Sequence, residues 1–165
     1  MNTTMKSVSI VRADLGNPAH ADAIVNLIDE YARDPMGGGA AIPPATLSRI
    51  IPGLRAHPAC LVWLAFDGEQ PLGVTICFLG YSTFQAAPLI NIHDVAVTTA
   101  ARGRGIGRML MNAVEAHARS IGCCKLTLEV RADNHVARGL YRDLGYSEVR
   151  QGPANAMMDF WRKPL

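Results

Sequence analysis

The stretch Asp94-Val95-Ala96-Val97-Thr98-Thr99-Ala100-Ala101-Arg102-Gly103-Arg104-Gly105-Ile106-Gly107-Arg108 decides how this chain folds. Its first residues end an apolar run over 89–98 that predicts a strand, and its last residues begin an amphipathic pattern that predicts a helix over 105–121. The turn between them is rich in glycine, so its backbone can approach a ligand closely, and the free amides of a helix start attract anions. The turn is therefore either a phosphate cradle or a tight connection whose glycines serve geometry alone.

The spacing of the glycines shows which known kinds of phosphate-binding loop this turn can match. A dinucleotide fingerprint has the form Gly-x-Gly-x-x-Gly, but counting from Gly103 and Gly105 puts Arg108 in the third place. A Walker loop requires Gly-Lys followed by Ser or Thr, which this turn lacks. What remains is a basic turn suited to a pyrophosphate.

Outward from this turn, the chain alternates short strand and helix patterns. Toward the N-terminus we predict a strand at 7–13, a helix beginning at Asn17-Pro18, a loop over 34–40, a short or broken helix at 47–54 cut by Pro52-Gly53, a hairpin of strands 60–66 and 72–79, and an irregular segment over 81–88. Toward the C-terminus we predict a strand over 125–130, a helix over 134–144, and weaker strands over 146–149 and 156–161. Hairpins combined with crossover helices imply an α/β (α+β) domain spanning 1–165, with a mixed, mostly antiparallel sheet of about six to seven strands flanked by about four helices.

Composition and charge exclude several classes of protein. Hydrophobic residues make up 49% of the chain and charged residues 18%, which rules out a disordered protein. No charged residue occurs from Gln70 through Ile92, but glycines, a proline and several polar residues interrupt this stretch, so we expect no membrane span. A net charge of +2 argues against a nucleic-acid binder. The cysteines and histidines lack metal-ligand spacing, so we expect no metal, and we expect reduced thiols in a cytoplasmic protein.

Two motifs give the chain a specific resemblance. The segment 94–110 resembles the acetyl-CoA signature of the GNAT superfamily of N-acetyltransferases, Gln/Arg-x-x-Gly-x-Gly/Ala, with Arg102, Gly105 and Gly107 in its fixed places. The segment 134–146 resembles the same family's Asn-x-x-Ala-x-x-Leu-Tyr-x-x-x-Gly-Phe/Tyr motif, with Asn134 and Tyr141 in place. The two motifs occur in the family's order, separated by a predicted helix and strand.

The resemblance implies how acetyl-CoA would bind. Backbone amides of the glycine-rich turn would hold the pyrophosphate of the co-substrate. The main chain of Val95 and Val97 would pair with the pantetheine arm like an added strand, which needs an open strand edge, and Asn134 would hydrogen-bond the same arm. The full set of expected co-substrate residues is Val95, Ala96, Val97, Arg102, Gly103, Arg104, Gly105, Ile106, Gly107, Arg108, Asn134 and Ala137.

Acetyl transfer to an amine needs a base for the amine and a proton donor for the leaving thiol. Tyr141 lies two helical turns after Asn134 on the same face, and the resemblance places a catalytic tyrosine there, so we expect it to be the acid. Strand alternation would put Asn91, His93, Val95 and Val97 on one face, so we expect His93, with an ordinary pKa of about 6.5, to be the base. Glu129 and a water relay remain alternatives. Asp94 would point the other way unless a bulge shifts the alternation, so we expect a structural role for it, such as pairing with an arginine.

The resemblance implies an N-acetyltransferase that acts by direct attack in a ternary complex on a primary amine of a small molecule or peptide. A non-catalytic CoA-binding sensor or interaction module is the alternative function. We expect the acceptor to bind between the first helix, the loop over 34–44 and the segment 81–88. A homodimer is a further expectation from the resemblance, and the identity of the acceptor amine stays open.

Overall fold

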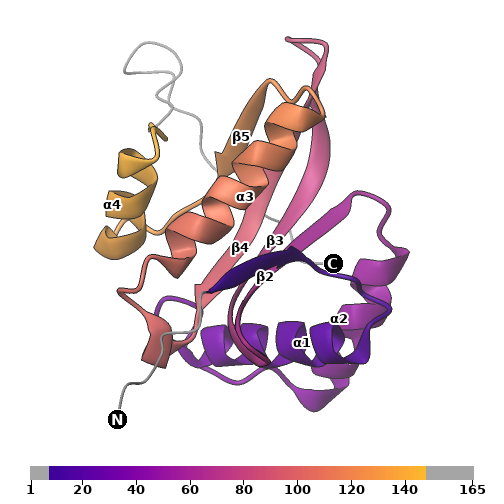
Figure 1. Ribbon diagram of the computed structural model, residues 1–165, viewed down its shortest axis with the longest axis vertical. Helices are drawn as coiled ribbons and strands as arrows, with labels where there is room; N and C mark the ends of the chain where they lie inside the picture. Colours follow the sequence, from indigo (N-terminus) through magenta and orange to yellow (C-terminus); the bar gives the residue numbers. More distant parts are fainter. Residues whose placement is uncertain (1–7, 148–165) are drawn as a thin grey trace.

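The computed structural model describes residues 8–147, in which five strands and four α-helices follow one another (Figure 1). In chain order they are β1 (Ser9–Arg12), α1 (Pro18–Arg33), α2 (Pro44–Ala56), β2 (Cys60–Asp67), β3 (Gln70–Ser82), β4 (Ala87–Val97), the 3-10 turn η1 (Thr99–Ala101), α3 (Ile106–Ser120), β5 (Lys125–Leu128) and α4 (His135–Asp143).

One sheet joins the strands in the order β1-β2-β3-β4-β5. The first three pairings are antiparallel and the pairing of β4 with β5 is parallel, which confirms the predicted mixed, mostly antiparallel sheet. The expected count of six to seven strands includes two at the C-terminus. The segment 156–161 and most of 146–149 lie outside the described residues, and residues 146 and 147 belong to no strand.

Helices cover both faces of the sheet (Figure 1). The face toward α1 and α2 packs around Ile24, Leu64 and Val74, which are almost completely buried. The face toward α3 packs around Ile90, Leu110 and Val114, and α4 adds partly buried side chains to this layer. The two layers leave β4 at the centre of the molecule, next to the glycine-rich turn that follows it.

The first helix forms as the sequence predicts, and the second is longer than predicted. Asn17 caps α1 by accepting the amide proton of Ala19 at 2.9 Å, and Pro18 takes the first helical position, where its missing N–H costs nothing. The predicted break at Pro52-Gly53 is wrong, since α2 continues to Ala56 with Pro52 inside it. Proline removes one helical hydrogen bond, and the surroundings at Pro52 and Ser48 are solvent-exposed, so water can replace it.

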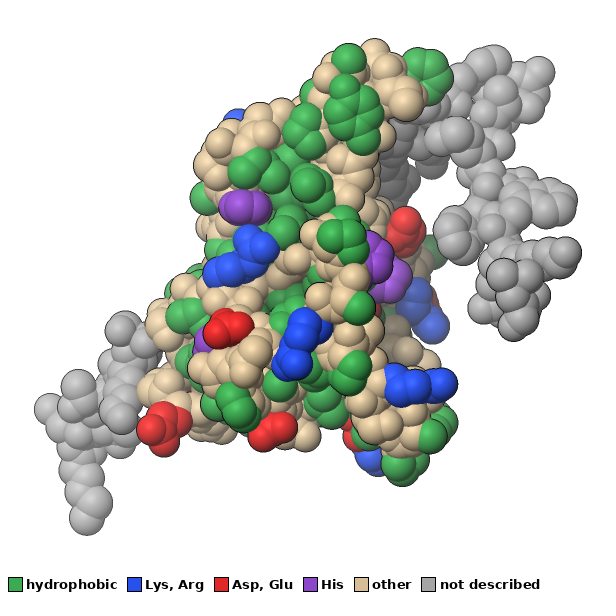
Figure 2. Space-filling model, turned by 90° about the vertical axis from the view of Figure 1, so that its right-hand side faces the viewer, with side chains coloured by type: hydrophobic (Ala, Val, Ile, Leu, Met, Phe, Trp, Pro, Cys, Tyr) green, Lys and Arg blue, Asp and Glu red, His purple; other side chains and the backbone are tan. Residues whose placement is uncertain are grey.

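The segment 81–88 is also more regular than predicted. Strands β3 and β4 stay paired as far as Ser82 and Ala87, so only 83–86 form the turn. This end of the hairpin projects beyond the helices (Figure 1) and lacks charged side chains, and Figure 2 shows hydrophobic side chains gathered over the upper part of the molecule. It lies at the opposite end of β4 from Val97, away from the glycine-rich turn.

The other half of β4 contains a β-bulge and separates from β5. Ile76 of β3 lies opposite Asp94 while its neighbour Cys77 lies opposite Ile92, so His93 is an extra residue in β4. Beside the bulge, β5 stops pairing with β4 at Leu128. Residues 93–97 of β4 therefore have a free edge on the side that β5 leaves.

Candidate active site

A cleft of about 530 Å³ lies at this free edge of β4. The glycine-rich turn, α4 and the end of α1 form its walls. Of the residues predicted to bind the co-substrate, all but Arg104 line it. Its lining residues are Tyr31, Asp34, Met36, Val95, Ala96, Val97, Ala101, Arg102, Gly103, Gly105, Ile106, Gly107, Arg108, Asn134, Val136, Ala137, Leu140, Tyr141 and Asp143.

The main chain of Val95 and Val97 points into the cleft. Thr98 donates its amide proton to Leu72 at 2.9 Å, and amides alternate in direction along a strand. Thr98 and Ala96 therefore face β3, whereas Val95 and Val97 turn their N–H and C=O groups to the free edge. The edge is open for an extended ligand to pair with, as the sequence predicted.

The glycine-rich turn presents unpaired amides to the same cleft. The first hydrogen bond of α3 runs from the amide of Met109 to the carbonyl of Gly105, so the amides of residues 106–108 have no partner within the helix. Gly105 caps the helix without a side chain, at φ +77°, and Gly103 has φ +78°. Such φ angles favour glycine, and the absence of side chains keeps the amides accessible to an anion.

We expect Gly105→Ala to destabilise the protein by about 1–2 kcal/mol, because alanine is strained at this positive φ. Thermal unfolding should show a melting temperature lower by roughly 2–8 °C. Gly53→Ala is the matched control, since Gly53 lies inside α2 with open space around its Cα. It should leave stability equal or higher by up to about 1 kcal/mol, and an equal loss in both variants would contradict the strain argument.

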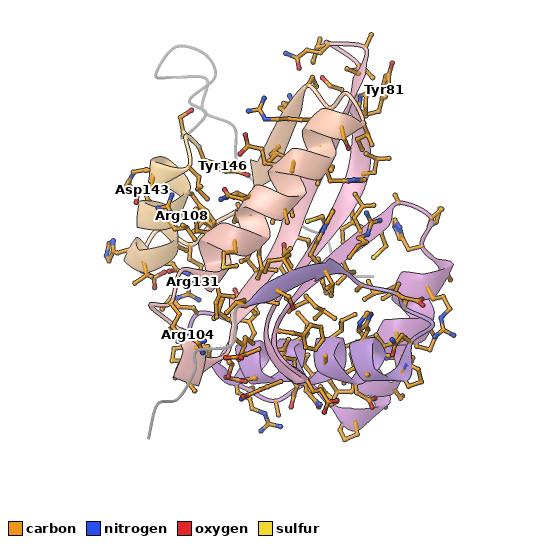
Figure 3. All side chains as sticks on the ribbon, in the orientation of Figure 1. Tyr81, Arg104, Arg108, Arg131, Asp143 and Tyr146 are labelled. Atoms are coloured by element: carbon orange, nitrogen blue, oxygen red, sulfur yellow. The ribbon has the colours of Figure 1, made fainter. Side chains whose placement is uncertain are left out.

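The arginines of the turn each contact a carboxylate. Arg102 reaches Asp34 at 2.8 Å, and both residues line the cleft. Arg108 reaches Asp143 of α4 at 3.1 Å (Figure 3), whereas Arg104 contacts Asp67, outside the cleft lining, at 3.2 Å. Arg102 also donates its Nε proton to the carbonyl of Val97 at 3.3 Å. Exposed ion pairs contribute at most about 1 kcal/mol to stability. A pyrophosphate could therefore replace these carboxylates as the partner of the arginines at a small cost in free energy.

Glu30 of α1 fixes the start of the turn. One of its carboxylate oxygens accepts both the hydroxyl proton of Thr98 and the amide proton of Thr99, each at 2.9 Å. This contact ties α1 to the end of β4 and to η1. Sequence reasoning placed no functional residue here, because the contact joins residues that lie 68 and 69 positions apart.

We expect Glu30→Ala to raise the KM for the ligand that binds at the glycine-rich turn about fivefold, with kcat nearly unchanged. The substitution removes the charged acceptor of two hydrogen bonds, so the start of the turn is held less firmly in position. Steady-state kinetics measures the split between KM and kcat. Glu30→Gln keeps a side-chain oxygen in place and should restore most of the affinity. An unchanged KM in the alanine variant would contradict the positioning role.

Asn134 and Tyr141 lie on the opposite wall, on α4. The side-chain oxygen of Asn134 caps the helix by accepting the amide proton of Ala137 at 3.1 Å, as its position in the sequence predicted, which leaves the side-chain NH₂ to donate. Tyr141 is half-buried in the cleft, and its ring centroid lies 5.9 Å from that of Tyr146, with the two ring planes tilted against each other. Burial, and to a lesser degree the nearby Tyr31, raises the pKa of Tyr141 to about 12, so its hydroxyl stays protonated.

The bulge corrects the predicted faces of β4. Ile90, Ile92, Val95 and Val97 all pack on the α3 side, so His93 does not share a face with Val95 and Val97 as expected. His93 contacts Phe78, which packs on the α1 side, at 5.6 Å between ring centroids, and Asp94 acts electrostatically on Tyr31 of α1. A residue inserted into one strand turns its neighbour to the same side, so His93 and Asp94 both face the α1 side.

Sequence reasoning missed Tyr31 and did not select Asp94 as the base. Burial raises the pKa of Asp94, against the opposing effect of His93, and no residue between 8 and 147 makes a hydrogen bond or ion pair with its carboxylate. Burial, followed by the charges of Asp94 and Asp34, raises the pKa of Tyr31, which lines the cleft. Glu129, the alternative base, is exposed beyond the end of β5.

Comparison with known proteins decides the family. The profile described as "Acetyltransferase (GNAT) family" matches residues 24–146, which include the cleft and both motifs. The chain belongs to this family. Acetyltransferases of the GNAT family generally use acetyl-CoA, and the open strand edge and the amide-rich turn suit its pantetheine arm and its pyrophosphate.

Two curated relatives and one solved structure are similar to this chain. It is 31% identical over 109 residues to the N-alpha-acetyltransferase RimI of Mycobacterium tuberculosis, a match covering 65% of this chain and 62% of that protein. It is 27% identical over 143 residues to the thialysine N-epsilon-acetyltransferase of Caenorhabditis elegans, covering 86% and 84%. The integron cassette protein VCH_CASS6 of V. cholerae shares the fold, with a TM-score of 0.79 at 23% identity, over 96% and 93% of the two chains.

The described part of the chain contains neither a helix long and apolar enough to cross a membrane nor a group of three or more potential metal ligands. Its four cysteine thiols are free.

Proposed function

We propose that this acetyltransferase moves an acetyl group from acetyl-CoA to a primary amine by direct attack in a ternary complex. The observation that carries the proposal is one cleft lined by an open strand edge, an amide-rich turn and a protonated tyrosine. The carboxylate of Asp94 lies outside this lining, in the residue before Val95 and on the α1 side. Acetyl-CoA would supply the activated acetyl group as a thioester.

Different groups of the chain would bind different parts of acetyl-CoA. Amides of 106–108 and the arginines of the turn would bind the pyrophosphate, and the main chain of Val95 and Val97 with the Asn134 amide would hold the arm. Tyr141 would donate a hydrogen bond to the sulfur as negative charge develops there. Since a phenol with a pKa of about 12 is a weaker acid than a thiol of about 8.5, stabilisation rather than complete proton transfer is its main contribution.

Asp94 is the base that this geometry favours, with His93 beside it as the second candidate. The amine nitrogen carries a positive charge once it bonds to the carbonyl carbon, and a nearby carboxylate can then take its proton. Both side chains face the α1 side, and Asp94 acts electrostatically on Tyr31, which lines the cleft, so an acceptor bound on that side would lie near both groups. The relatives act on an α-amine and on an ε-amine by their names, which supports an amine acceptor here.

The deciding experiment combines acetyl-CoA with a panel of primary amines and measures released thiol. We expect amine-dependent thiol release and an acetylated amine of the expected mass. Tight CoA binding without thiol release for any amine in the panel would instead favour the alternative, a CoA-binding sensor. A covalently acetylated enzyme that forms without amine would contradict direct attack.

We also propose a cellular location and an oligomeric state. A cytoplasmic protein suits the free thiols and the acetyl-CoA donor, and no nucleic acid or membrane is required for the reaction. We keep the homodimer as a proposal, and sedimentation of the full chain measures it.

A further inference from the structure

Three rings form a row on the α1 and α2 side of the sheet, beside the bulge. His57 at the end of α2 lies 4.9 Å from Phe78 of β3, and Phe78 lies 5.6 Å from His93 of β4, measured between ring centroids. The planes of His57 and Phe78 are tilted by 59°, and those of Phe78 and His93 meet edge to face at 70°, so neither pair is stacked in parallel. We call this row the ring shelf.

The ring shelf is accessible. Helix α2 ends at Ala56, and β3 and β4 extend beyond α1 and α2 (Figure 1). His57 and His93 are exposed and Phe78 is half-buried. Phe78 packs in part against the core on the α1 side, and the rest of its ring lies exposed between the two imidazoles, where a ligand can contact it.

The ring shelf ends at a carboxylate without a partner. Asp94 follows His93 directly and faces the same side, and it makes no hydrogen bond or ion pair with any residue from 8 to 147. The other carboxylates at the end of α1 differ, because Asp29 contacts Arg33 and Asp34 contacts Arg102, each at 2.8 Å. A half-buried carboxylate without a partner is partly shielded from water, so a bound cation would stabilise its charge.

We infer that the acceptor is an arylalkylamine, a primary amine joined by a short alkyl chain to a flat aromatic group, with its nitrogen at Asp94 and its ring on the ring shelf. This inference rests on the proposed acetyl transfer and names its substrate class. The aromatic group would pack on Phe78 and the two imidazoles, which gains buried apolar area and ring contacts. A polyamine or an aminoglycoside would present further ammonium groups to the shelf, where Asp29 and Asp34 are already paired.

The test compares 2-phenylethylamine with n-butylamine and spermidine at saturating acetyl-CoA. We expect kcat/KM for 2-phenylethylamine to exceed that for n-butylamine about tenfold. Phe78→Leu keeps an apolar side chain in the layer but removes the ring, and should reduce this preference to about twofold or less, mainly through KM. Phe66→Leu is the matched control, since Phe66 is half-buried in the same layer but contacts His20 instead of the ring shelf, and should keep the preference.

The outcomes separate this inference from the proposed function. Equal kcat/KM for the aryl and alkyl amines, or a preference for spermidine, overturns the inference and leaves acetyl transfer intact. Retention of the tenfold preference in Phe78→Leu also overturns it. If no amine releases thiol, acetyl transfer fails, and imidazole NMR of the CoA-bound protein decides the inference. Shifts of the His57 and His93 signals on adding 2-phenylethylamine support the ring shelf as a binding site, and unchanged signals overturn it.

Discussion

Tyr141→Phe should lower kcat about 100-fold while leaving the KM for acetyl-CoA within about twofold, because a positioned proton or hydrogen-bond donor contributes at least that factor. The phenyl ring keeps the packing of Tyr141 against the layer of α3, and only the hydroxyl is removed. Burial raises the pKa of Tyr141 to about 12, so the hydroxyl remains a donor throughout the neutral and moderately alkaline range. Steady-state thiol release between pH 6 and pH 9.5 measures the effect.

Tyr146→Phe is the control for this prediction. Tyr146 stacks on Tyr141 and packs against the same layer, but it does not line the cleft. Its variant should keep kcat within about twofold, so a large loss would point to a shared packing effect. A descending limb below pH 9.5 that disappears in Tyr141→Phe would contradict the protonated state, since such a limb requires a much lower pKa.

The parts of the active site that sequence predicts are those set by local geometry. The turn from Arg102 to Gly107 follows from glycine and from the helix that starts there, and the cap at Asn134 with Tyr141 two turns later follows from helical spacing. Each of these features depends on a dozen consecutive residues or fewer, so the local sequence pattern is enough to predict it.

The parts that sequence misses depend on partners far along the chain. The bulge at His93 exists only relative to β3, and one extra residue reverses which side every later residue faces. Alternation counted along β4 alone therefore puts His93 with Val95 and leaves Asp94 with a structural role. Tyr31 fits the apolar face of α1 in sequence, and only the position of α1 against the end of β4 brings it into the cleft.

Asp94→Asn should lower kcat/KM for the amine at least 100-fold, because asparagine cannot accept the amine proton. Burial raises the pKa of Asp94 and His93 opposes this effect, so the ascending limb of the pH profile should lie above the ordinary aspartate range. The deprotonated form is the active one, and the asparagine variant should lack this limb. His93→Gln identifies the base, since a loss larger than that of Asp94→Asn would transfer the role to His93.

Stability distinguishes a catalytic Asp94 from a structural one. A raised pKa in the folded state means that ionised Asp94 destabilises the fold at every pH above that pKa, and that this cost disappears as the pH falls toward the ordinary aspartate pKa of about 3.9. Asp94→Asn removes the buried charge, so its melting temperature at pH 7 should equal or exceed that of the unaltered protein, and the difference should shrink in acid. A structural carboxylate with a partner would behave in the opposite way, losing stability at pH 7 when it is replaced. Reduced activity together with undiminished stability is therefore the pair of results that assigns Asp94 to the reaction.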